Sequence, residues 1–271
     1  MPTAVFNGVK LYFEDAGSGQ PVVLVHGSWT DHYSWDQVTP SLAKRFRVVS
    51  YDRRGHSQSE RPSSQGSVHE DVADLAALIE DRGLAPAHII GNSFGASIAL
   101  RLAVARPELF QSLCVHEPPL FGLLAADPAT APMLAATAEA IGSVLESLGA
   151  GEMENGARQF VEVILGPGAW EEILNPVDRE TFINNAPTFL DEAQDPQSLI
   201  LDLATLAGFS RPALVTVGSA SPPSFSPVVT RVAEAIPDAR THTFEGVGHL
   251  PHHTHPDQFV DVVTSFVGGV G

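Results

Sequence analysis

The feature that most constrains the fold of this chain is a serine held between two glycines. It lies in Gly91-Asn92-Ser93-Phe94-Gly95, directly after the apolar run 87–90 and directly before the helix-like run 96–103. A strand that turns at once into a helix holds the residue at its apex in a strained backbone conformation, and the side chain projects above the sheet. Large side chains two positions to either side would collide there. The stretch therefore predicts a strand, a sharp turn and a helix, with the Ser93 hydroxyl at the apex.

Four continuous apolar runs predict strands that are buried on both faces, at Val22–Val25, Val48–Tyr51, Ala87–Ile90 and Ala213–Val217. Such runs, unlike alternating ones, are typical of a parallel sheet covered by helices. Between the second and third runs, Ser67 and Glu70 form a capping box that predicts a helix, and Gly83 ends it. Strand and helix therefore alternate, which predicts a doubly wound α/β fold.

Two segments depart from this alternation. Asn7-Gly8 lies between two short strand-like runs and predicts an N-terminal hairpin. From residue 120 to 210 the chain reads as helices separated by prolines, and strand signals return at Ala213. We therefore expect a core domain made of residues 1–119 and 211–271. Residues 120–210 should form a helical cap over the C-terminal edge of the sheet, where folds of this class hold ligands.

Composition argues against several classes of function. The 271 residues carry a formal net charge of −17, which would repel the phosphates of nucleic acid. No apolar stretch is long enough to span a membrane, and the start of the chain lacks the basic flank and apolar core of a signal peptide. The single cysteine, Cys114, lies in an apolar run. We expect it to be a buried thiol in a cytoplasmic protein.

Ser93 needs partners elsewhere in the chain if it is to act chemically. A serine hydroxyl is a poor nucleophile at neutral pH and requires a general base, and the base requires an acid that orients it. His249 is the expected base, because it follows the strand-like run 241–244 near the C-terminus.

Four motifs together resemble the α/β-hydrolase family over nearly the whole chain: His26-Gly27, the segment 52–57, the turn at Ser93, and Gly248-His249. The resemblance implies an α/β-hydrolase fold with an inserted cap and a serine nucleophile at a G-x-S-x-G elbow. It also implies the chain order serine, acid, histidine. The usual acid in this family is an aspartate in the loop after the strand that here is 213–217.

That aspartate is missing from this chain. Ser221 occupies its place, and no Asp or Glu occurs from Leu203 to Ala233. A second location for the acid is the end of the preceding strand, where Glu117 stands before two prolines. We therefore predict the catalytic triad Ser93–His249–Glu117. The alternative is that Glu117 merely caps a helix or faces solvent.

The oxyanion of an acyl-transfer intermediate needs two backbone N–H donors. Phe94 should supply one, because it follows the nucleophile at the start of a helix, where N–H groups are free. Ser28 should supply the other, by its position in the loop after the first buried strand. Since Ser28 would act through its backbone, Ser28→Ala should matter little and a proline there should be severe.

Aromatic residues on the loops and in the predicted cap are candidates for a substrate pocket. The first choices are Trp29, Tyr33, Trp170 and Phe189, with Phe182 and Phe225 as further candidates. His252, His253 and His255 raise the possibility of a metal site. However, Pro251 and Pro256 interrupt a helical ligand spacing, so we expect no metal and no organic cofactor. Asp52 and Arg53 are interpreted as a structural pair.

Within the family, Glu117 with its prolines and the acid-free loop around Ser221 are similar to the zearalenone lactonase group. Those enzymes use a glutamate after this strand and hydrolyse a macrocyclic lactone. The elbow and the first loop of this chain differ from theirs, so the same substrate is not assumed. We expect a serine hydrolase that cleaves an apolar, small-molecule ester or lactone through an acyl-enzyme.

Two alternatives stay open. One is a hydrolase of C–C bonds in diketone-type substrates, for which Arg158 and Arg179 are the only nearby candidates to bind a carboxylate. The other is a ligand-binding protein that turns over slowly or not at all. The oligomeric state is also left open, a homodimer included.

Overall fold

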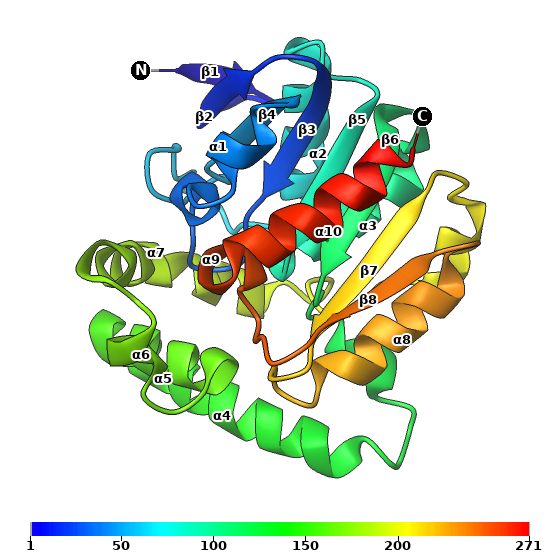
Figure 1. The fold of residues 1–271 in the computed structure, drawn as a ribbon. Helices are drawn as coiled ribbons and strands as arrows, with labels where there is room; N and C mark the ends of the chain where they lie inside the picture. Colours follow the sequence, from blue (N-terminus) through cyan, green and yellow to red (C-terminus); the bar gives the residue numbers. More distant parts are fainter. Residues whose placement is uncertain (1, 271) are drawn as a thin grey trace.

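A computed structural model describes residues 2–270 of the chain. Its eight strands form one sheet in the order β1-β2-β4-β3-β5-β6-β7-β8, as Figure 1 shows. The pairs β1–β2 and β2–β4 are antiparallel, and every other pair is parallel. This confirms the mostly parallel sheet. The strands are β1 (Thr3–Phe6), β2 (Val9–Gly17), β3 (Gln20–Val25), β4 (Phe46–Tyr51), β5 (Ala87–Asn92), β6 (Phe110–His116), β7 (Ala213–Gly218) and β8 (Arg240–Phe244).

Helices cover both faces of this sheet. On one face lie α2 (Val68–Asp81), α3 (Phe94–Ala105) and α8 (Phe225–Ala235), whose apolar side chains join the largest core cluster. On the other lie η1 (His32–Trp35), α1 (Thr39–Leu42) and α10 (Pro256–Gly268), around a second cluster that includes Cys114. Cys114 is 3% exposed, and its burial raises its pKa to about 12, which makes it the buried thiol expected.

The local signals in the sequence account for the element boundaries. Asn7 and Gly8 both have positive φ, at 47° and 80°, as a two-residue hairpin turn between β1 and β2 requires. The helix α2 begins after the capping box of Ser67 and Glu70 and ends just before Gly83, whose φ is 62°.

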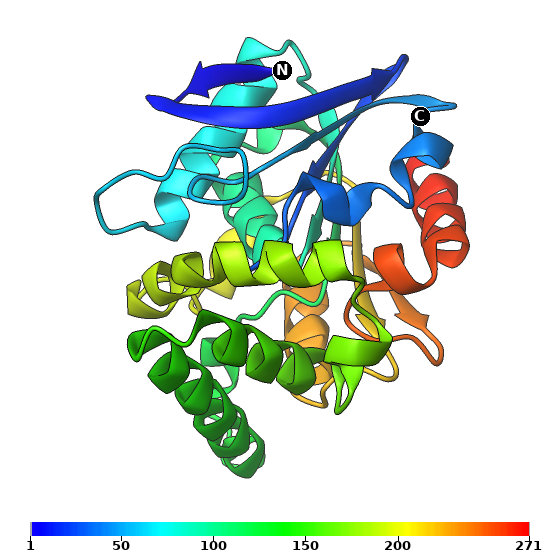
Figure 2. The same ribbon diagram turned by 90° about the vertical axis from the view of Figure 1, so that its left-hand side faces the viewer.

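A block of helices lies beyond the C-terminal edge of the parallel strands, in the lower part of Figure 2. It comprises α4 (Ala131–Gly149), α5 (Met153–Leu165), α6 (Ala169–Glu172) and α7 (Pro176–Gln194), which pack on one another around a third apolar cluster. The short helices η3 (Phe121–Leu124) and η4 (Leu203–Gly208) pack on α8 instead. The domain boundaries at 120 and 210 stay a prediction. No helix in the described residues has the length and apolarity needed to cross a membrane.

Candidate active site

Ser93 stands at a strained junction between β5 and α3. Its backbone has φ 54° and ψ −122°, outside the regions that L-residues ordinarily populate. A Cβ atom at Gly91 would lie 2.6 Å from the carbonyl oxygen of Gly95, and one at Gly95 would overlap the backbone of Val25. The two glycines are therefore what permits the turn. The strain is the cost of projecting the Ser93 side chain at the end of the strand.

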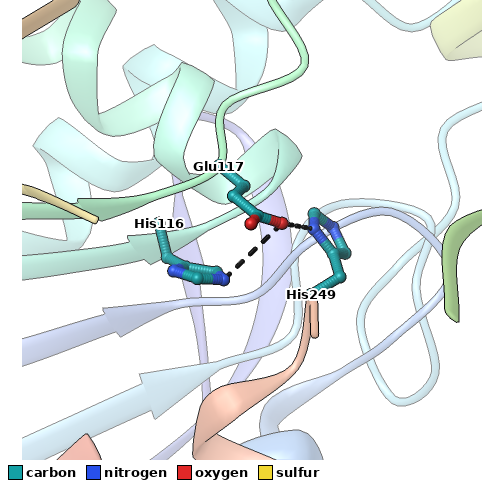
Figure 3. A group of neighbouring side chains, drawn as sticks. All are labelled: His116, Glu117 and His249. Carbon is teal, nitrogen blue, oxygen red and sulfur yellow. Dashed lines mark hydrogen bonds and ion pairs between the residues drawn. The ribbon is translucent and has the colours of Figure 1, made fainter. Parts of the chain in front are cut away.

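Glu117 comes directly after β6 and also has a left-handed backbone, with φ 47°. Its side chain is fully buried and points at His249, as Figure 3 shows. The Oε2 atom lies 2.5 Å from Nδ1 of His249, and Oε1 accepts a 2.7 Å hydrogen bond from the backbone N–H of Gly218. Both carboxylate oxygens are thus held, one of them by the imidazole.

The pKa of Glu117 reflects two opposed influences. Burial raises it, because the charged form loses its hydration. The hydrogen bond from His249 outweighs this effect, together with the attraction of His116 and His249 in their charged forms and a smaller contribution from Ser221, and the pKa falls to about 2. His116 lies with Nε2 3.6 Å from Glu117 Oε2, and its own burial lowers its pKa to about 4. Glu117 is therefore a carboxylate at neutral pH, beside an uncharged His116.

Two further contacts fix the orientation of His249. Its ring stacks on Phe225 with 4.6 Å between ring centroids, and its backbone carbonyl accepts a 3.0 Å hydrogen bond from the side-chain amide of Asn92. Asn92 is the neighbour of Ser93, so it ties the elbow to the histidine loop. Because Nδ1 faces Glu117, Nε2 is the nitrogen left to serve Ser93.

Ser93 and His249 line the same cavity, although no hydrogen bond joins their side chains in the described residues. Such bonds are often long in unliganded enzymes and tighten when substrate binds. Gly27 packs against the serine, since a Cβ atom there would lie 3.0 Å from Ser93 Cβ. The next residue, Ser28, lines the cavity too.

The two N–H groups predicted to bind an oxyanion are therefore near the serine. Phe94 is the first residue of α3, and Ser28 belongs to the loop that lies against Ser93. In residues 2–270 neither N–H has a protein acceptor. Free N–H donors beside a strained serine are the groups that an oxyanion hole requires, and their role stays a prediction.

The family follows from comparison with known proteins. A model of the alpha/beta hydrolase family matches residues 22–262, which is most of the chain. This protein belongs to the alpha/beta hydrolase family. As the fold already indicated, the resemblance carried by the sequence motifs is thereby confirmed at the level of the family.

Three relatives of this alpha/beta hydrolase differ in the chemistry that their names record. The "Putative carbamate hydrolase RutD" of Azorhizobium caulinodans is 28% identical over 289 residues, covering 100% of this chain and 99% of that protein. The soluble epoxide hydrolase of Corynebacterium sp. is 33% identical over 112 residues, which span only 41% of this chain and 39% of that protein. The enol-lactonase of Burkholderia xenovorans has a TM-score of 0.74 and 21% identity, covering 98% of this chain and 100% of that one.

The cavity beside Ser93 has a polar floor and an apolar wall. The floor comes from the core and includes Ser28, Asn92, Ser93 and His249. The wall comes mainly from the helical block. The apolar wall residues are Phe160, Val161, Ile164, Leu165, Phe182 and Leu250.

None of the four first-choice pocket aromatics is among the described residues that line this cavity. Trp29 is fully buried and stacks on the outer side of the wall, with its ring centroid 4.7 Å from that of Phe160. Phe189 packs on both of these rings, at 5.2 and 5.0 Å. Trp170 is buried inside the helical block, whereas Tyr33 is 52% exposed at a neighbouring hollow.

The part of the cavity wall that α5 forms, which we call the α5 wall, was not predicted, although the sequence of α5 carried a signal for it. Phe160, Val161, Ile164 and Leu165 recur at helical spacing, so one face of α5 is apolar. The sequence could not show whether that face meets the core or the active site. His116 was missed because nothing in the sequence distinguishes it from an ordinary buried histidine.

Within residues 2–270, two clusters have donor atoms close enough to hold a metal ion: His116, Glu117 and His249, and Asp31, His32 and Asp52. The first is the hydrogen-bonded group described above. In the second, Asp52 Oδ1 binds His32 Nδ1 at 2.6 Å, and Asp31 Oδ2 accepts from Ser57 at 2.7 Å. Hydrogen bonds within the protein thus engage several of these atoms, whereas His116 Nε2 has no hydrogen-bond partner in the described residues.

His252 and His253 take no part in either cluster. His252 is buried and stacks on Trp35 at 4.2 Å, while His253 lies 3.6 Å from Asp178. The pairing interpreted for Asp52 and Arg53 does not form. Asp52 binds His32, and the guanidinium of Arg53 binds Asp71 at 3.0 Å.

Proposed function

We propose that this alpha/beta hydrolase cleaves carboxylic esters or lactones through an acyl-enzyme formed on Ser93. The observation that carries the proposal is the 2.5 Å contact between Glu117 Oε2 and His249 Nδ1, beside a serine on a strained elbow. A buried carboxylate against one imidazole nitrogen fixes the tautomer and leaves the other nitrogen free to accept a proton.

The reaction would run in two halves. His249 Nε2 takes the hydroxyl proton as Ser93 Oγ attacks the acyl carbon, and the N–H groups of Phe94 and Ser28 receive the charge that develops on the carbonyl oxygen. Glu117 stabilises the imidazolium, which then gives its proton to the leaving alkoxide. In the second half, water attacks the acyl-enzyme with His249 again as the base, and Ser93 regains its proton.

The nucleophile argues against the other chemistries named among the relatives. Opening an epoxide or displacing a halide through an alkyl-enzyme ester calls for a carboxylate nucleophile, and position 93 is a serine. A carbamate, by contrast, offers an acyl carbon that the same serine can attack. Carbamates therefore belong in the substrate panel.

The cavity supports an apolar acyl group. Phe160, Ile164 and Leu165 of α5 line the same cavity as Ser93 and offer it apolar surface. No cationic side chain is among the described residues that line this cavity. Arg158 and Arg179, the candidates for a diketone carboxylate, pair with Glu171 at 2.7 and 2.9 Å. The C–C hydrolase alternative thus lacks the cation on which it depended.

The test is mass spectrometry on a pooled panel of aryl esters, alkyl esters, lactones, carbamates, epoxides and diketone acids, with Ser93→Ala as the blank. We expect acid and alcohol pairs or ring-opened lactones that depend on Ser93, and a trapped protein whose mass has grown by one acyl group. Diol formation from an epoxide by both proteins would contradict the proposal. If wild type and Ser93→Ala are both inactive on every substrate of the panel, the result would favour the ligand-binding alternative.

A further inference from the structure

Several hydrogen bonds link α7 to the loop that lies against Ser93, including those from Asn185 to the carbonyls of Trp29 and Thr30, but one of them involves a buried carboxylate. Ser28 Oγ donates to Glu192 Oε2 at 2.5 Å, across 164 positions in the sequence. Glu192 belongs to α7, and its side chain is only 9% exposed. A carboxylate this deeply buried, 2.5 Å from the side chain of a proposed oxyanion donor, calls for a physical account.

Arg53 is the second partner of Glu192. Its Nη2 donates to Glu192 Oε1 at 3.0 Å, and the guanidinium is 2% exposed. The same group lies over the ring of Phe94, 4.6 Å from the centroid, and Nη1 donates to the carbonyl oxygen of Gly27 at 3.2 Å. Arg53 therefore touches both segments that carry the proposed oxyanion donors.

The contact with Gly27 bears directly on Ser28. The carbonyl of Gly27 and the N–H of Ser28 belong to one peptide unit, which is planar and trans, so the two groups point in opposite directions. Holding the oxygen from the protein side therefore fixes the direction of the N–H on the cavity side. A cation on the oxygen also polarises the amide and strengthens its N–H as a donor.

His26 holds the same oxygen. Its Nε2 accepts a 2.9 Å hydrogen bond from the backbone N–H of Arg53, so the proton of the neutral ring resides on Nδ1. Nδ1 lies 2.8 Å from Gly27 O and donates to it. Thr30 Oγ1 adds a longer, 3.4 Å hydrogen bond to the same carbonyl. Of the two shorter donors, His26 and Arg53, only Arg53 is in turn bound by Glu192 of the helical block.

We propose that Glu192 is a positioning residue, which through Ser28 Oγ and Arg53 fixes the Gly27–Ser28 peptide and couples α7 to the oxyanion donor. The inference rests on the proposed serine hydrolase chemistry. Glu192 touches neither substrate nor the reacting atoms in this scheme. Its removal should weaken stabilisation of the transition state more than binding of the ground state.

The test compares Glu192→Ala with Asp191→Ala on the ester that wild type hydrolyses fastest among p-nitrophenyl esters. Asp191 is the control, because it is the neighbouring residue on α7. It also pairs with an arginine outside the helical block, since Arg61 Nη2 lies 3.2 Å from Asp191 Oδ2. We expect Glu192→Ala to lower kcat about 10- to 100-fold, a fraction of the loss seen when an oxyanion donor is removed. KM should stay within about twofold, and Asp191→Ala should match wild type in both constants.

A second set of variants guards against misfolding. Ser28→Ala keeps the Arg53–Glu192 pair and the backbone N–H. The sequence alone predicts little effect of this change, but the loss of the Oγ contact with Glu192 should lower kcat about tenfold. Combined with Glu192→Ala, it should add little further loss, because both act through one hydrogen bond. Glu192→Gln keeps an acceptor for Ser28 and should retain more activity than Glu192→Ala. Affinity for benzyl trifluoromethyl ketone, which places an oxyanion in the hole, should fall in parallel with kcat.

The outcomes separate the two proposals. If Ser93→Ala hydrolyses the ester as well as wild type, the proposed function fails and this inference falls with it. If Ser93 is essential but Glu192→Ala and Ser28→Ala keep wild-type kcat, the positioning role is wrong. Two further results would also overturn it and leave Glu192 as a purely structural contact. One is a change in KM with kcat unchanged, and the other is a loss of kcat in the double variant that equals the product of the losses in the two single variants.

Discussion

The ends of β6 and β7 are adjacent in the sheet, yet they are built differently. After β6 stands Glu117, fully buried, with both carboxylate oxygens held by hydrogen bonds. β7 ends at Gly218, whose N–H is one of the donors to that carboxylate, and the loop after it carries Ser221, whose buried hydroxyl makes no well-formed hydrogen bond in the described residues. One strand end supplies the charge, and the other supports it.

In the proposed triad the acid comes from the β6 end, one strand away from the loop in which this family usually carries it. An imidazole needs a carboxylate against Nδ1, and either of two neighbouring strand ends can bring one there. The β7 loop is nevertheless joined to the histidine loop, since Ala220 N–H donates to Val247 O at 3.0 Å. The β7 loop therefore supports the histidine loop and supplies no catalytic group to the proposed triad.

The largest expected effect is the loss of the charge at the β6 end. Glu117→Gln keeps the shape of the side chain but replaces the acceptor of His249 Nδ1–H, so the imidazolium loses its stabilisation. We expect kcat to fall about 10⁴-fold, as for comparable triad carboxylates. Steady-state kinetics on the best ester measure this, with circular dichroism as the check on folding. Unchanged turnover would mean that another acid, or none, orients His249.

A smaller effect should come from moving the charge to the β7 end. In the Glu117→Gln background, Ser221→Asp introduces a carboxylate on the neighbouring loop, and we expect it to restore about 10- to 100-fold of the lost kcat. The matched control is Ser221→Asn in the same background, which has the same size without the charge. Equal rates for the Asp and Asn variants would show that only the β6 end can serve His249.

A third effect concerns stability and its dependence on pH. The folded-state pKa of Glu117 is about 2, below its ordinary value of 4.5, so the ionised form stabilises the folded protein. That contribution is present above pH 4.5 and is lost as the pH falls toward 2. The free energy of unfolding of wild type should therefore exceed that of Glu117→Gln at pH 7 by on the order of 1 kcal/mol, because part of the pKa shift comes from the charged form of His116, which is absent at that pH.

Urea titrations at a series of pH values measure this difference, which should narrow steadily below pH 4.5. Ser221→Ala serves as the control, because it carries no titrating group. A difference that stays constant with pH would show that the hydrogen-bonded shape of Glu117, and not its charge, supports the folded state.

Sequence reasoning succeeded where the physical cause is local. The strained turn at Ser93 needs glycines at fixed offsets, and the hairpin at Asn7-Gly8 needs positive φ, so both could be predicted. The sheet followed from continuous apolar runs. Glu117 was found because the β7 loop has no carboxylate, and the structure brings it against His249.

What the sequence could not show depends on how distant segments pack. Trp29 and Phe189 were expected in the pocket. They instead stack on each other behind its wall, where they pack in the third apolar cluster. Nothing in the sequence distinguishes Glu192 from the other acidic residues of its segment. Only the approach of α7 to Arg53 makes it a buried one, and no spacing in the chain reports that approach.

The smallest effect should come from Ser221→Ala in the wild-type background, where the β7 end loses its only candidate side chain. The Ser221 hydroxyl is buried and makes no well-formed hydrogen bond in the described residues, although it contributes to the lowered pKa of Glu117. Its removal therefore loses only a weak contact, and we expect kcat within about twofold of wild type and an unfolding free energy within about 1 kcal/mol of it. A loss of tenfold or more in kcat would mean that the β7 end takes part in the chemistry, and the contrast between the two strand ends would no longer hold.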